Sequence, residues 1–485
     1  MQYTSTRDHT KRVSASQAIL QGISPDGGLY VPTEFPQVSP EEFYGLTYPQ
    51  TAEKVLRLYL TDYDPAFLKQ VTEQVYSAEN FGGKAGFLAP VEENLWALEL
   101  WHGPTCAFKD YALQLMPHLL LQAKKNLGVS QTTKILVATS GDTGKAALAG
   151  YAGLPGIRIA VFYPNAGTSE IQRLQMATQE GENVAVYAVS GNFDDTQTGV
   201  KRAFADSALT NALAEKGEAL SSANSINWGR LVPQIVYYFY SYAKLVESGS
   251  IVSGAPVRYC VPTGNFGDIL AGYYAKRMGL PIEKLICASN KNKILTDFLT
   301  TGVYDIHRDF YKTTSPSMDI LISSNLERLL YHVTQDDNAV KNWMDSLVKE
   351  KAYTVSKEVL SAIQAVFDCG CAEDAQGSEE IRMRYEQDHY LCDTHTAVAL
   401  YTMRGKAKEK APCVVLSTAS PYKFPCAVLH ALGREVSSDE FEAMRLLHEK
   451  TGVPIPQSLA VLREKSIRFT DVIEPEMIAK TALSL

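Results

Sequence analysis

The sequence contains no CxxC pair among its eight cysteines. Paired cysteines are typical of zinc ribbons and thiol redox sites, so neither class is indicated, and reduced thiols in a cytoplasm are expected. The N-terminal residues MQYTSTRDHTKRVS lack the apolar core of a signal peptide. No apolar run approaches the roughly 18 to 20 residues that a membrane-spanning helix needs, so a membrane role is not expected.

An excess of positive charge is also absent. The chain has 46 Lys and Arg residues against 54 Asp and Glu residues, which gives a net charge of -8. This balance provides no broad attraction for nucleic acid or for an anionic membrane. Any phosphate that the protein binds must therefore meet a local site, and a small molecule is the expected partner.

The sequence does contain enough apolar material for a large globular enzyme. Hydrophobic residues make up 45% of its 485 residues, and no internal repeat or low-complexity tract interrupts them. A chain of this length exceeds what one hydrophobic core organises, so two or three domains with a site in a cleft between them are expected.

Strand-like apolar runs alternate with amphipathic helical stretches from about residue 90. Such runs occupy residues 134–140, 157–164, 183–191, 257–264 and 411–420. The alternation predicts an α/β protein with βαβ units and parallel sheets that carry helices on both faces. The predicted domains are a mainly helical cap over residues 1–88, an αβ lobe over 89–240, a second αβ lobe over 241–435, and a helical tail over 436–485.

The segment VPTGNFGD, residues 261–268, places a glycine-bearing loop between a strand and a helix. Gly264 and Gly267 let backbone amides approach an anion, and the helix N-terminus adds partial positive charge. A bound phosphate is one interpretation. The alternative is a structural βα turn with a glycine at positive φ.

A second loop, SGDTG, follows the strand at 134–140 and carries Ser140, Asp142 and Thr143. Ligands of open α/β sheets collect at the carboxyl ends of strands, so this loop is also well placed. It is not a P-loop, because that motif requires glycine where Thr139 stands and a hydroxyl residue where Ala146 stands. A helix cap made by Asp142 or Thr143 is compatible with a binding role.

Lys109 lies between Phe108 and Asp110 just before a helical run. Partial desolvation by apolar neighbours lowers the pKa of a lysine and allows its neutral amine to form a Schiff base. Taken alone, the segment fits a solvated surface lysine better. Lys109 and the two loops together provide a reactive amine, an anion-binding loop and a polar loop. These are the groups that bind pyridoxal phosphate.

The chain resembles the threonine synthase family of fold-type-II pyridoxal-phosphate enzymes. The resemblance rests on motifs in matching order and spacing: STR (5–7), HGPTCAFKD (102–110), ATSGDTGKAAL (138–148), SGNFDD (190–195), NSINWGRL (224–231), VPTGNFGDILAGYYAK (261–276), SPSMDI (315–320) and LSTASPYKF (416–424). It implies a tryptophan-synthase-β-like fold, with two parallel-sheet αβ lobes and a small N-terminal helical domain.

The resemblance also implies roles for particular residues. Lys109 would be the Schiff-base lysine, and Thr418 the hydroxyl partner of the pyridine nitrogen. Asp142 would face the cofactor 3'-hydroxyl, where many related enzymes carry Asn. The cofactor phosphate loop would comprise Gly264, Asn265, Phe266, Gly267 and Asp268.

The implied substrate, O-phospho-L-homoserine, brings a phosphate and a carboxylate that need donors of their own. The candidate donors are Ser140, Thr143, Lys145, Asn192, Asn224, Ser225 and Arg230. Arginine binds phosphate in a bidentate manner, but a structural ion pair explains Arg230 equally well. Loop and cap hydrogen bonds are the equal alternative for the asparagines.

Two further segments bear on the site. Residues 393–397, DTHTA, resemble a family segment written DPHTA, and the change from proline leaves the turn geometry open. The poor spacing of the nearby cysteines and histidines indicates buried thiols and surface histidines rather than a metal site. These residues are Cys369, Cys371, Cys392, His389 and His395.

The implied reaction is γ-elimination of phosphate followed by β-addition of water, which yields threonine in a monomeric or homodimeric cytoplasmic enzyme. One alternative is another fold-type-II lyase that cleaves phosphohomoserine without forming threonine. A dinucleotide-binding oxidoreductase is less well supported, because no G-x-G-x-x-G opens a βαβ unit with an acidic residue about 20 positions later. A non-catalytic binding protein fits least well.

Overall fold

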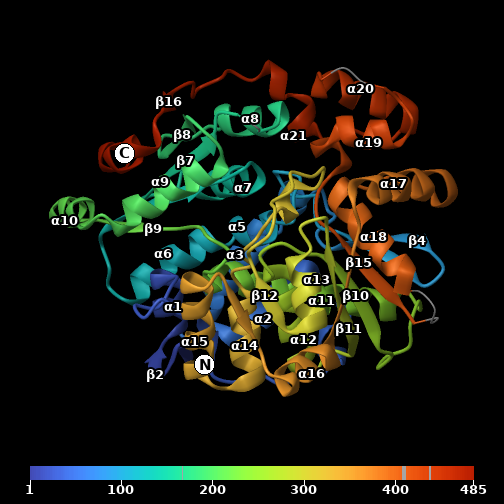
Figure 1. Ribbon diagram of the computed structural model, residues 1–485, viewed down its shortest axis with the longest axis horizontal. Helices are drawn as coiled ribbons and strands as arrows, with labels where there is room; N and C mark the ends of the chain where they lie inside the picture. Colours follow the sequence, from blue (N-terminus) through green and yellow to red (C-terminus); the bar gives the residue numbers. More distant parts are fainter. Residues whose placement is uncertain (167, 407–410, 436–437) are drawn as a thin grey trace.

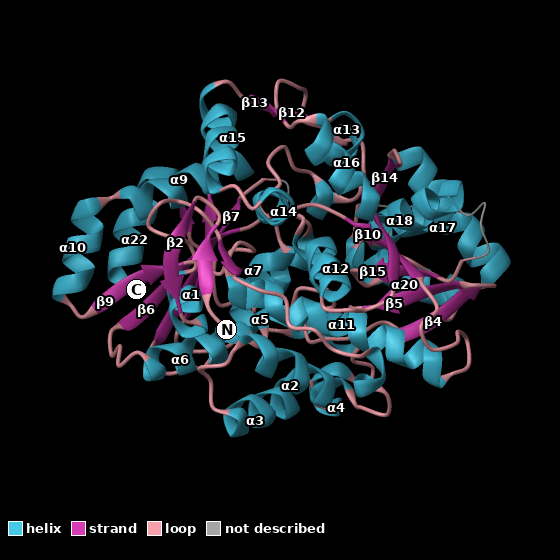
Figure 2. Cartoon of the chain, turned by 90° about the horizontal axis from the view of Figure 1, so that it is seen from below, coloured by secondary structure: helices cyan, strands magenta, loops and turns pink. Residues whose placement is uncertain are grey.

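The computed structural model describes residues 1–166, 168–406, 411–435 and 438–485. Two separate, mainly parallel sheets lie on opposite sides of the molecule, with helices packed between and around them (Figures 1 and 2). The predicted α/β class with two parallel-sheet lobes is therefore confirmed.

The larger sheet has six strands in the order β14-β11-β10-β15-β5-β4, and all neighbours except β4 and β5 pair in parallel. Its central strands are buried, as the apolar runs in the sequence predict. The strands are β4 (Phe87–Glu92), β5 (Leu95–Glu99), β10 (Val257–Pro262), β11 (Ile282–Ser289), β14 (Phe367–Cys371) and β15 (Cys413–Ser417).

The smaller sheet has five parallel strands in the order β16-β8-β7-β6-β9. The end of the chain returns to this sheet, where β16 pairs with β8 (Figure 1). The strands are β6 (Thr132–Ala138), β7 (Ile157–Pro164), β8 (Val184–Val189), β9 (Glu218–Ser221) and β16 (Val472–Ile473).

Helices surround both sheets, and α11 and α12 lie between them (Figure 2). The principal helices are α5 (Asp110–Leu113), α6 (Met116–Asn126), α7 (Asp142–Tyr151), α8 (Glu170–Ala177), α9 (Phe193–Ala205), α10 (Ser207–Glu215), α11 (Trp228–Glu247), α12 (Gly267–Arg277), α13 (Ile294–Thr301), α14 (Leu326–Thr334), α15 (Asp337–Lys349), α16 (Lys357–Val366), α17 (Asp374–Asp388), α18 (Thr394–Lys406), α19 (Pro425–Ala431), α20 (Glu440–Thr451), α21 (Gln457–Ala460) and α22 (Ile478–Ser484). None of the helices in the described part of the chain is long and apolar enough to cross a bilayer.

The N-terminal region adds a three-stranded antiparallel sheet to the predicted helices. Its strands are β1 (Tyr3–Ser5), β2 (Asp8–Val13) and β3 (Tyr30–Pro32), and its helices are α1 (Ala15–Gln21), α2 (Tyr48–Tyr59), α3 (Pro65–Val75) and α4 (Ala78–Phe81). β1 and β3 have only three residues each, and the six residues of β2, DHTKRV, are mostly polar, so the sequence shows no strand pattern here. Arg7 ties this region to α14 through Glu327, with Nε–Oε1 and Nη2–Oε2 distances of 2.8 and 2.7 Å.

The domain boundaries stay predictions, and strand pairing crosses two of them. β5 and most of β4 lie in the segment assigned to the first lobe, but both strands pair within the six-stranded sheet of the second. The tail is mainly helical as expected, yet β16 belongs to the five-stranded sheet. Sheet membership depends on long-range pairing, so alternation along the sequence does not reveal it.

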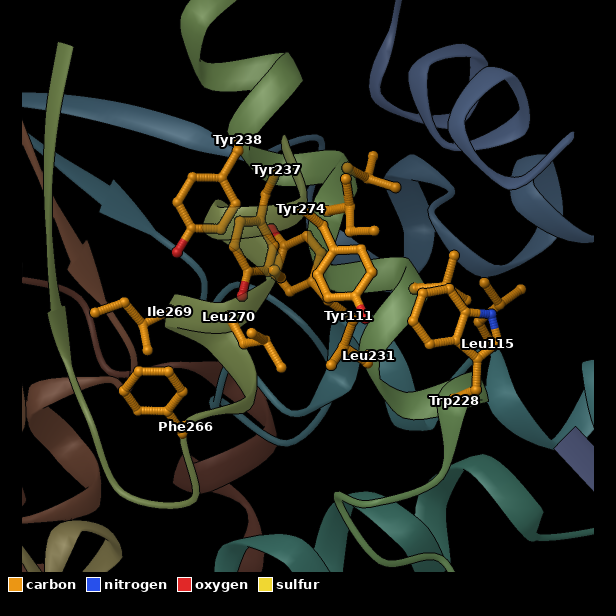
Figure 3. Close-up of a cluster of buried hydrophobic side chains, with 14 of the residues drawn as sticks. Tyr111, Leu115, Trp228, Leu231, Tyr237, Tyr238, Phe266, Ile269, Leu270 and Tyr274 are labelled. Atoms are coloured by element: carbon orange, nitrogen blue, oxygen red, sulfur yellow. The ribbon is translucent and has the colours of Figure 1, made fainter. Parts of the chain in front are cut away.

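An aromatic core joins α11, α12 and the strands beneath them. Figure 3 shows Tyr237 and Tyr238 of α11 beside Ile269 and Leu270 of α12. Tyr238 packs on Tyr259 of β10 with 4.9 Å between ring centroids. Each such aromatic pair adds about 0.5–1.5 kcal/mol beyond the area that it buries, so this core holds the first turn of α12 firmly.

Candidate active site

The carboxyl ends of β5 and β15 bring Lys109 and Thr418 together. The two strands are parallel neighbours, with Ser417 opposite Glu99. Beyond their ends, the N–H of Phe108 donates to the carbonyl oxygen of Thr418 at 2.8 Å. These two residues lie more than 300 positions apart in the sequence, and parallel pairing alone makes them neighbours.

Lys109 immediately precedes α5, and its amine is largely enclosed. Its Nζ lies 4.0 Å from Asp142 Oδ2 and 4.7 Å from the centre of the Phe108 ring. Burial lowers the pKa of Lys109, and the carboxylate of Asp142 opposes that effect. The charges of Arg230 and Lys423 lower this pKa further, while Asp268 raises it. The desolvated lysine that the sequence predicts is present, and more of its amine is neutral than in water.

Asp142 begins α7 and is almost fully buried. Its Oδ1 lies 2.9 Å from Lys423 Nζ and accepts a hydrogen bond from Gln172 Nε2 at 2.8 Å. Burial works to raise the pKa of Asp142, but the ammonium groups of Lys423 and Lys109 hold it well below its usual range. Asp142 is therefore a buried carboxylate between two lysines, and sequence reasoning missed Lys423 although it lies in the motif LSTASPYKF.

The loop between β10 and α12 has free amides and no positive-φ glycine. Phe266, rather than a glycine, adopts φ +62°, and its side chain lies below Ile269 and Leu270 (Figure 3). The centroid of its buried ring lies 5.5 Å from that of Phe367. Within the described residues, the N–H groups of residues 264–267 donate to no protein acceptor. Free amides at the N-terminus of an 11-residue helix match the requirements of a phosphate group.

Asp268 and Asn265 complete this loop. Burial raises the pKa of Asp268 to about 7, so a large part of this carboxyl is uncharged near neutrality. Its Oδ1 accepts the N–H of Ile269, which keeps the side chain at the start of α12. Asn265 Oδ1 accepts a hydrogen bond from Ser324 at 3.4 Å.

Arg230 is a buried guanidinium without a carboxylate partner among the described residues. Its Nη1 donates to the carbonyl oxygen of Ala223 at 2.6 Å, while Nε is buried and has no partner. Burial lowers the pKa of Arg230 to about 10. The structural ion pair that the sequence left open for Arg230 is absent among the described residues. An anionic ligand would balance the charge of this buried guanidinium.

The other candidates of the SGDTG loop differ in exposure. Ser140 is exposed and Thr143 is half-buried. Lys145 Nζ donates to Gln179 Oε1. Burial lowers the pKa of Lys145 to about 8, and Lys465 and Lys423 contribute to the shift.

The polar candidates at 192 and 224–225 are only partly brought together. Ser225 Oγ lies 3.5 Å from Ser324 Oγ, which also contacts Asn265, so the NSINWGR segment borders the loop between β10 and α12. Asn224 is exposed. Asn192 caps α9, because its Oδ1 accepts the N–H groups of residues 194 and 195 at 2.8 and 3.1 Å. The hydrogen bonds of Asn192 are therefore those of a helix cap.

Thr418 is buried, yet its hydroxyl forms no hydrogen bond with the described residues. The hydroxyl oxygen is not among the fully buried unpaired side-chain atoms, so it borders accessible space. Because its backbone carbonyl binds Phe108, the residue is fixed next to Lys109 while its side chain stays available to a ligand.

The cysteines and histidines near residue 390 form no group of three potential metal ligands in the described residues. His395 was expected at the surface, and that expectation is wrong. It is buried, with Nδ1 2.7 Å from Asp393 Oδ2 and Nε2 accepting the N–H of Ser317 at 3.1 Å. Cys392 is buried, while Cys369 and Cys371 are only partly buried.

Comparisons with known proteins agree with this geometry. The model of the family "Pyridoxal-phosphate dependent enzyme" matches residues 85–419. The models "Threonine synthase N terminus" and "Threonine synthase, C-terminal" match residues 2–76 and 396–481. The threonine synthase of Pseudomonas aeruginosa is 39% identical over 496 aligned residues, which cover 99% of this chain and 97% of that protein.

The chain belongs to the threonine synthase family. The pyridoxal-phosphate-bound threonine synthase of Brucella melitensis superposes with a TM-score of 0.89 at 37% identity, over 100% of this chain and 99% of that one. Human threonine synthase-like 1 is 40% identical over 92% of this chain, but the chain spans only 62% of that protein's length. The cofactor of the family is pyridoxal phosphate, and the free amides of residues 264–267 fit its phosphate.

Proposed function

We propose that this protein is a threonine synthase, a carbon-oxygen lyase that converts O-phospho-L-homoserine and water to L-threonine and phosphate. The observation that carries the proposal is a full-length match to threonine synthases combined with an uncompensated buried cation, Arg230, near Lys109. Arg230 supplies charge for a second anionic group besides the cofactor phosphate. The proposed substrate brings two such groups, its phosphate and its carboxylate.

Lys109 and the residues around it would bind four different groups of the cofactor. Lys109 would bind its aldehyde, and the amides of residues 264–267 its phosphate. Asp142 would face the 3'-hydroxyl and Thr418 the ring nitrogen. When bound, pyridoxal phosphate supplies an electron-accepting ring that stabilises carbanions at the substrate.

Lys109 would then move protons. Its lowered pKa makes the amine a better base near neutral pH than an exposed lysine, and its enclosure excludes competing water. Arg230 and Lys145 are the substrate-phosphate donors best supported by burial and charge. Ser140, Thr143, Asn224 and Ser225 remain further candidates, and Asn192 is supported least because its oxygen caps a helix.

Product analysis tests this function. The cofactor-loaded enzyme, incubated with O-phospho-L-homoserine, should release threonine and inorganic phosphate in a ratio of about 1:1, because β-addition of water completes every elimination. Amino-acid chromatography and a phosphate assay on the same samples measure the ratio. Phosphate released with 2-oxobutyrate and little threonine would instead establish the alternative phosphohomoserine lyase.

Thr418 offers a second test, since its hydroxyl has no hydrogen bond to lose among the residues that the structure describes. Thr418→Val should weaken cofactor retention about tenfold, the equivalent of roughly one hydrogen bond, and leave the melting temperature nearly unchanged. Equilibrium dialysis and thermal unfolding without cofactor measure the two effects. Thr402→Val is a matched control, because that buried threonine bonds only to Val398 O in its own helix. Equal cofactor affinity in both variants would show that Thr418 does not touch the ring nitrogen.

We also propose a cytoplasmic enzyme, monomeric or homodimeric, that has no nucleic-acid partner. All eight cysteines are free, which suits a reducing compartment. The net charge of -8 disfavours association with nucleic acid.

A further inference from the structure

Lys423 is a second lysine at the site, and it is more deeply buried than Lys109. Its side chain has no exposed surface, and it ends the short 3-10 helix at Pro421–Lys423 that follows β15. The Nζ atom contacts Asp142 Oδ1, Gln175 Oε1 and the carbonyl oxygen of Thr105. Lysines are almost never fully buried unless paired, so the contact with Asp142 is the reason that this charge is tolerated.

The two oxygens of Asp142 serve different partners. Oδ1 faces Lys423 at 2.9 Å and Gln172 at 2.8 Å, while Oδ2 faces Lys109 at 4.0 Å. Two contacts on one oxygen fix the rotation of the carboxylate plane. The remaining oxygen is thereby presented to the reactive amine.

We infer that Lys423 is a positioning residue, which fixes Asp142 as a carboxylate aimed at Lys109 and balances the charge around that amine. This inference rests on the proposed cofactor site, because Lys109 matters only if it binds the cofactor. It does not depend on which product the enzyme releases.

The direction of its effect follows from the groups that face Lys109. They are Asp142 from α7, Arg230 from α11, Asp268 from α12 and Lys423. Removing Lys423 deletes a positive charge and leaves Asp142 with Lys109 as its nearest cation. Both changes favour a proton on the Lys109 nitrogen, so a proton there should be lost at higher pH.

Other groups face Lys423, and none of them reverses this direction. Asp110, Glu440, Lys145 and Cys106 all interact with it electrostatically. Without Lys423, the carboxylates of Asp110 and Glu440 are also less compensated. Their negative charge again favours the protonated nitrogen.

The test is a pH titration of the visible absorption of the cofactor-loaded enzyme. In Lys423→Met the midpoint should rise by about one pH unit relative to the wild type, and in Asp142→Asn it should fall by about the same amount. The double variant Lys423→Met/Asp142→Asn removes one charge of each sign, so its midpoint should return near the wild-type value. Borohydride reduction and peptide mapping verify that the absorption belongs to Lys109 in each variant.

Lys134→Met is the matched control. Lys134 is also a buried lysine, paired with Glu218 at 2.8 Å, but it lies in β6 toward the strand end opposite the SGDTG loop. Its loss should cost stability without moving the midpoint. A midpoint in Lys423→Met that equals that of Lys134→Met would overturn the inference.

The double variant keeps the test decisive if Lys423→Met fails to fold with an unpaired Asp142. Its midpoint should then exceed that of Asp142→Asn by about one unit, because only the Lys423 charge differs between them. Equal midpoints would overturn the inference. A wild type without absorption on Lys109 would refute the cofactor site itself, whereas a normal titration with the wrong product would refute only the proposed function.

Discussion

Replacing Lys109 with alanine should abolish the visible absorption of the bound cofactor and reduce threonine formation by on the order of 10³-fold or more. The loss is large because one amine would both hold the cofactor and move the protons of the reaction. Its position is well defined by the contact with Asp142 at 4.0 Å and by the backbone bond between Phe108 and Thr418. Lys423, the other lysine that contacts Asp142, lies on Oδ1 and not on the oxygen that faces Lys109.

Lys145→Ala is the comparison that makes this result specific. Lys145 is also largely enclosed, and burial lowers its pKa to about 8, so it is another lysine of the SGDTG loop region that can offer a neutral amine. We expect Lys145→Ala to retain the visible band, whatever it does to substrate binding. Absorption spectra, borohydride reduction and peptide mapping of both variants measure the outcome. A label on Lys145 in the wild type would contradict the assignment of the whole site.

The sequence predicted the elements whose pattern is local. β6, β7, β8 and β10 are buried parallel strands and therefore read as continuous apolar runs. The position of β5 was not predictable in the same way. Its place beside β15 depends on a pairing more than 300 residues away in the sequence.

The same distinction holds for the site. Glycine-bearing loops at strand ends predicted two walls of the candidate site, the neighbours of Lys109 drew attention to that residue, and the family resemblance implied its role and that of Thr418. Lys423 escaped notice because a lysine in a short loop is usually solvated, and only the fold buries it against Asp142. The left-handed conformation at Phe266 was equally hidden, since a bulky residue rarely adopts it and the neighbouring glycines were the natural candidates.

The proposed phosphate loop should also be sensitive to changes at its two glycines, but for different reasons. A Cβ at Gly264 would lie 2.7 Å from the backbone oxygen of Ser317, a contact that cannot relax without moving the loop. A Cβ at Gly267 would meet only the side-chain amides of Asn325 and Gln234 at 3.6 Å, an ordinary contact. Neither glycine has a positive φ, so backbone strain does not contribute at either position.

Gly264→Val should therefore lower both the melting temperature and the cofactor affinity, whereas Gly267→Val should lower mainly the affinity. We expect the dissociation constant of pyridoxal phosphate to rise about 100-fold in each, which corresponds to roughly two lost hydrogen bonds to a charged group. Equilibrium dialysis measures the affinity, and thermal unfolding without cofactor measures the stability. If Gly267→Val kept both wild-type values, the amides of residues 264–267 would not hold the phosphate and the loop would be a structural turn. A loss of affinity without a loss of stability at Gly267 would separate the anion site from the fold, because in that variant the added methyl groups disturb the ligand and not the protein.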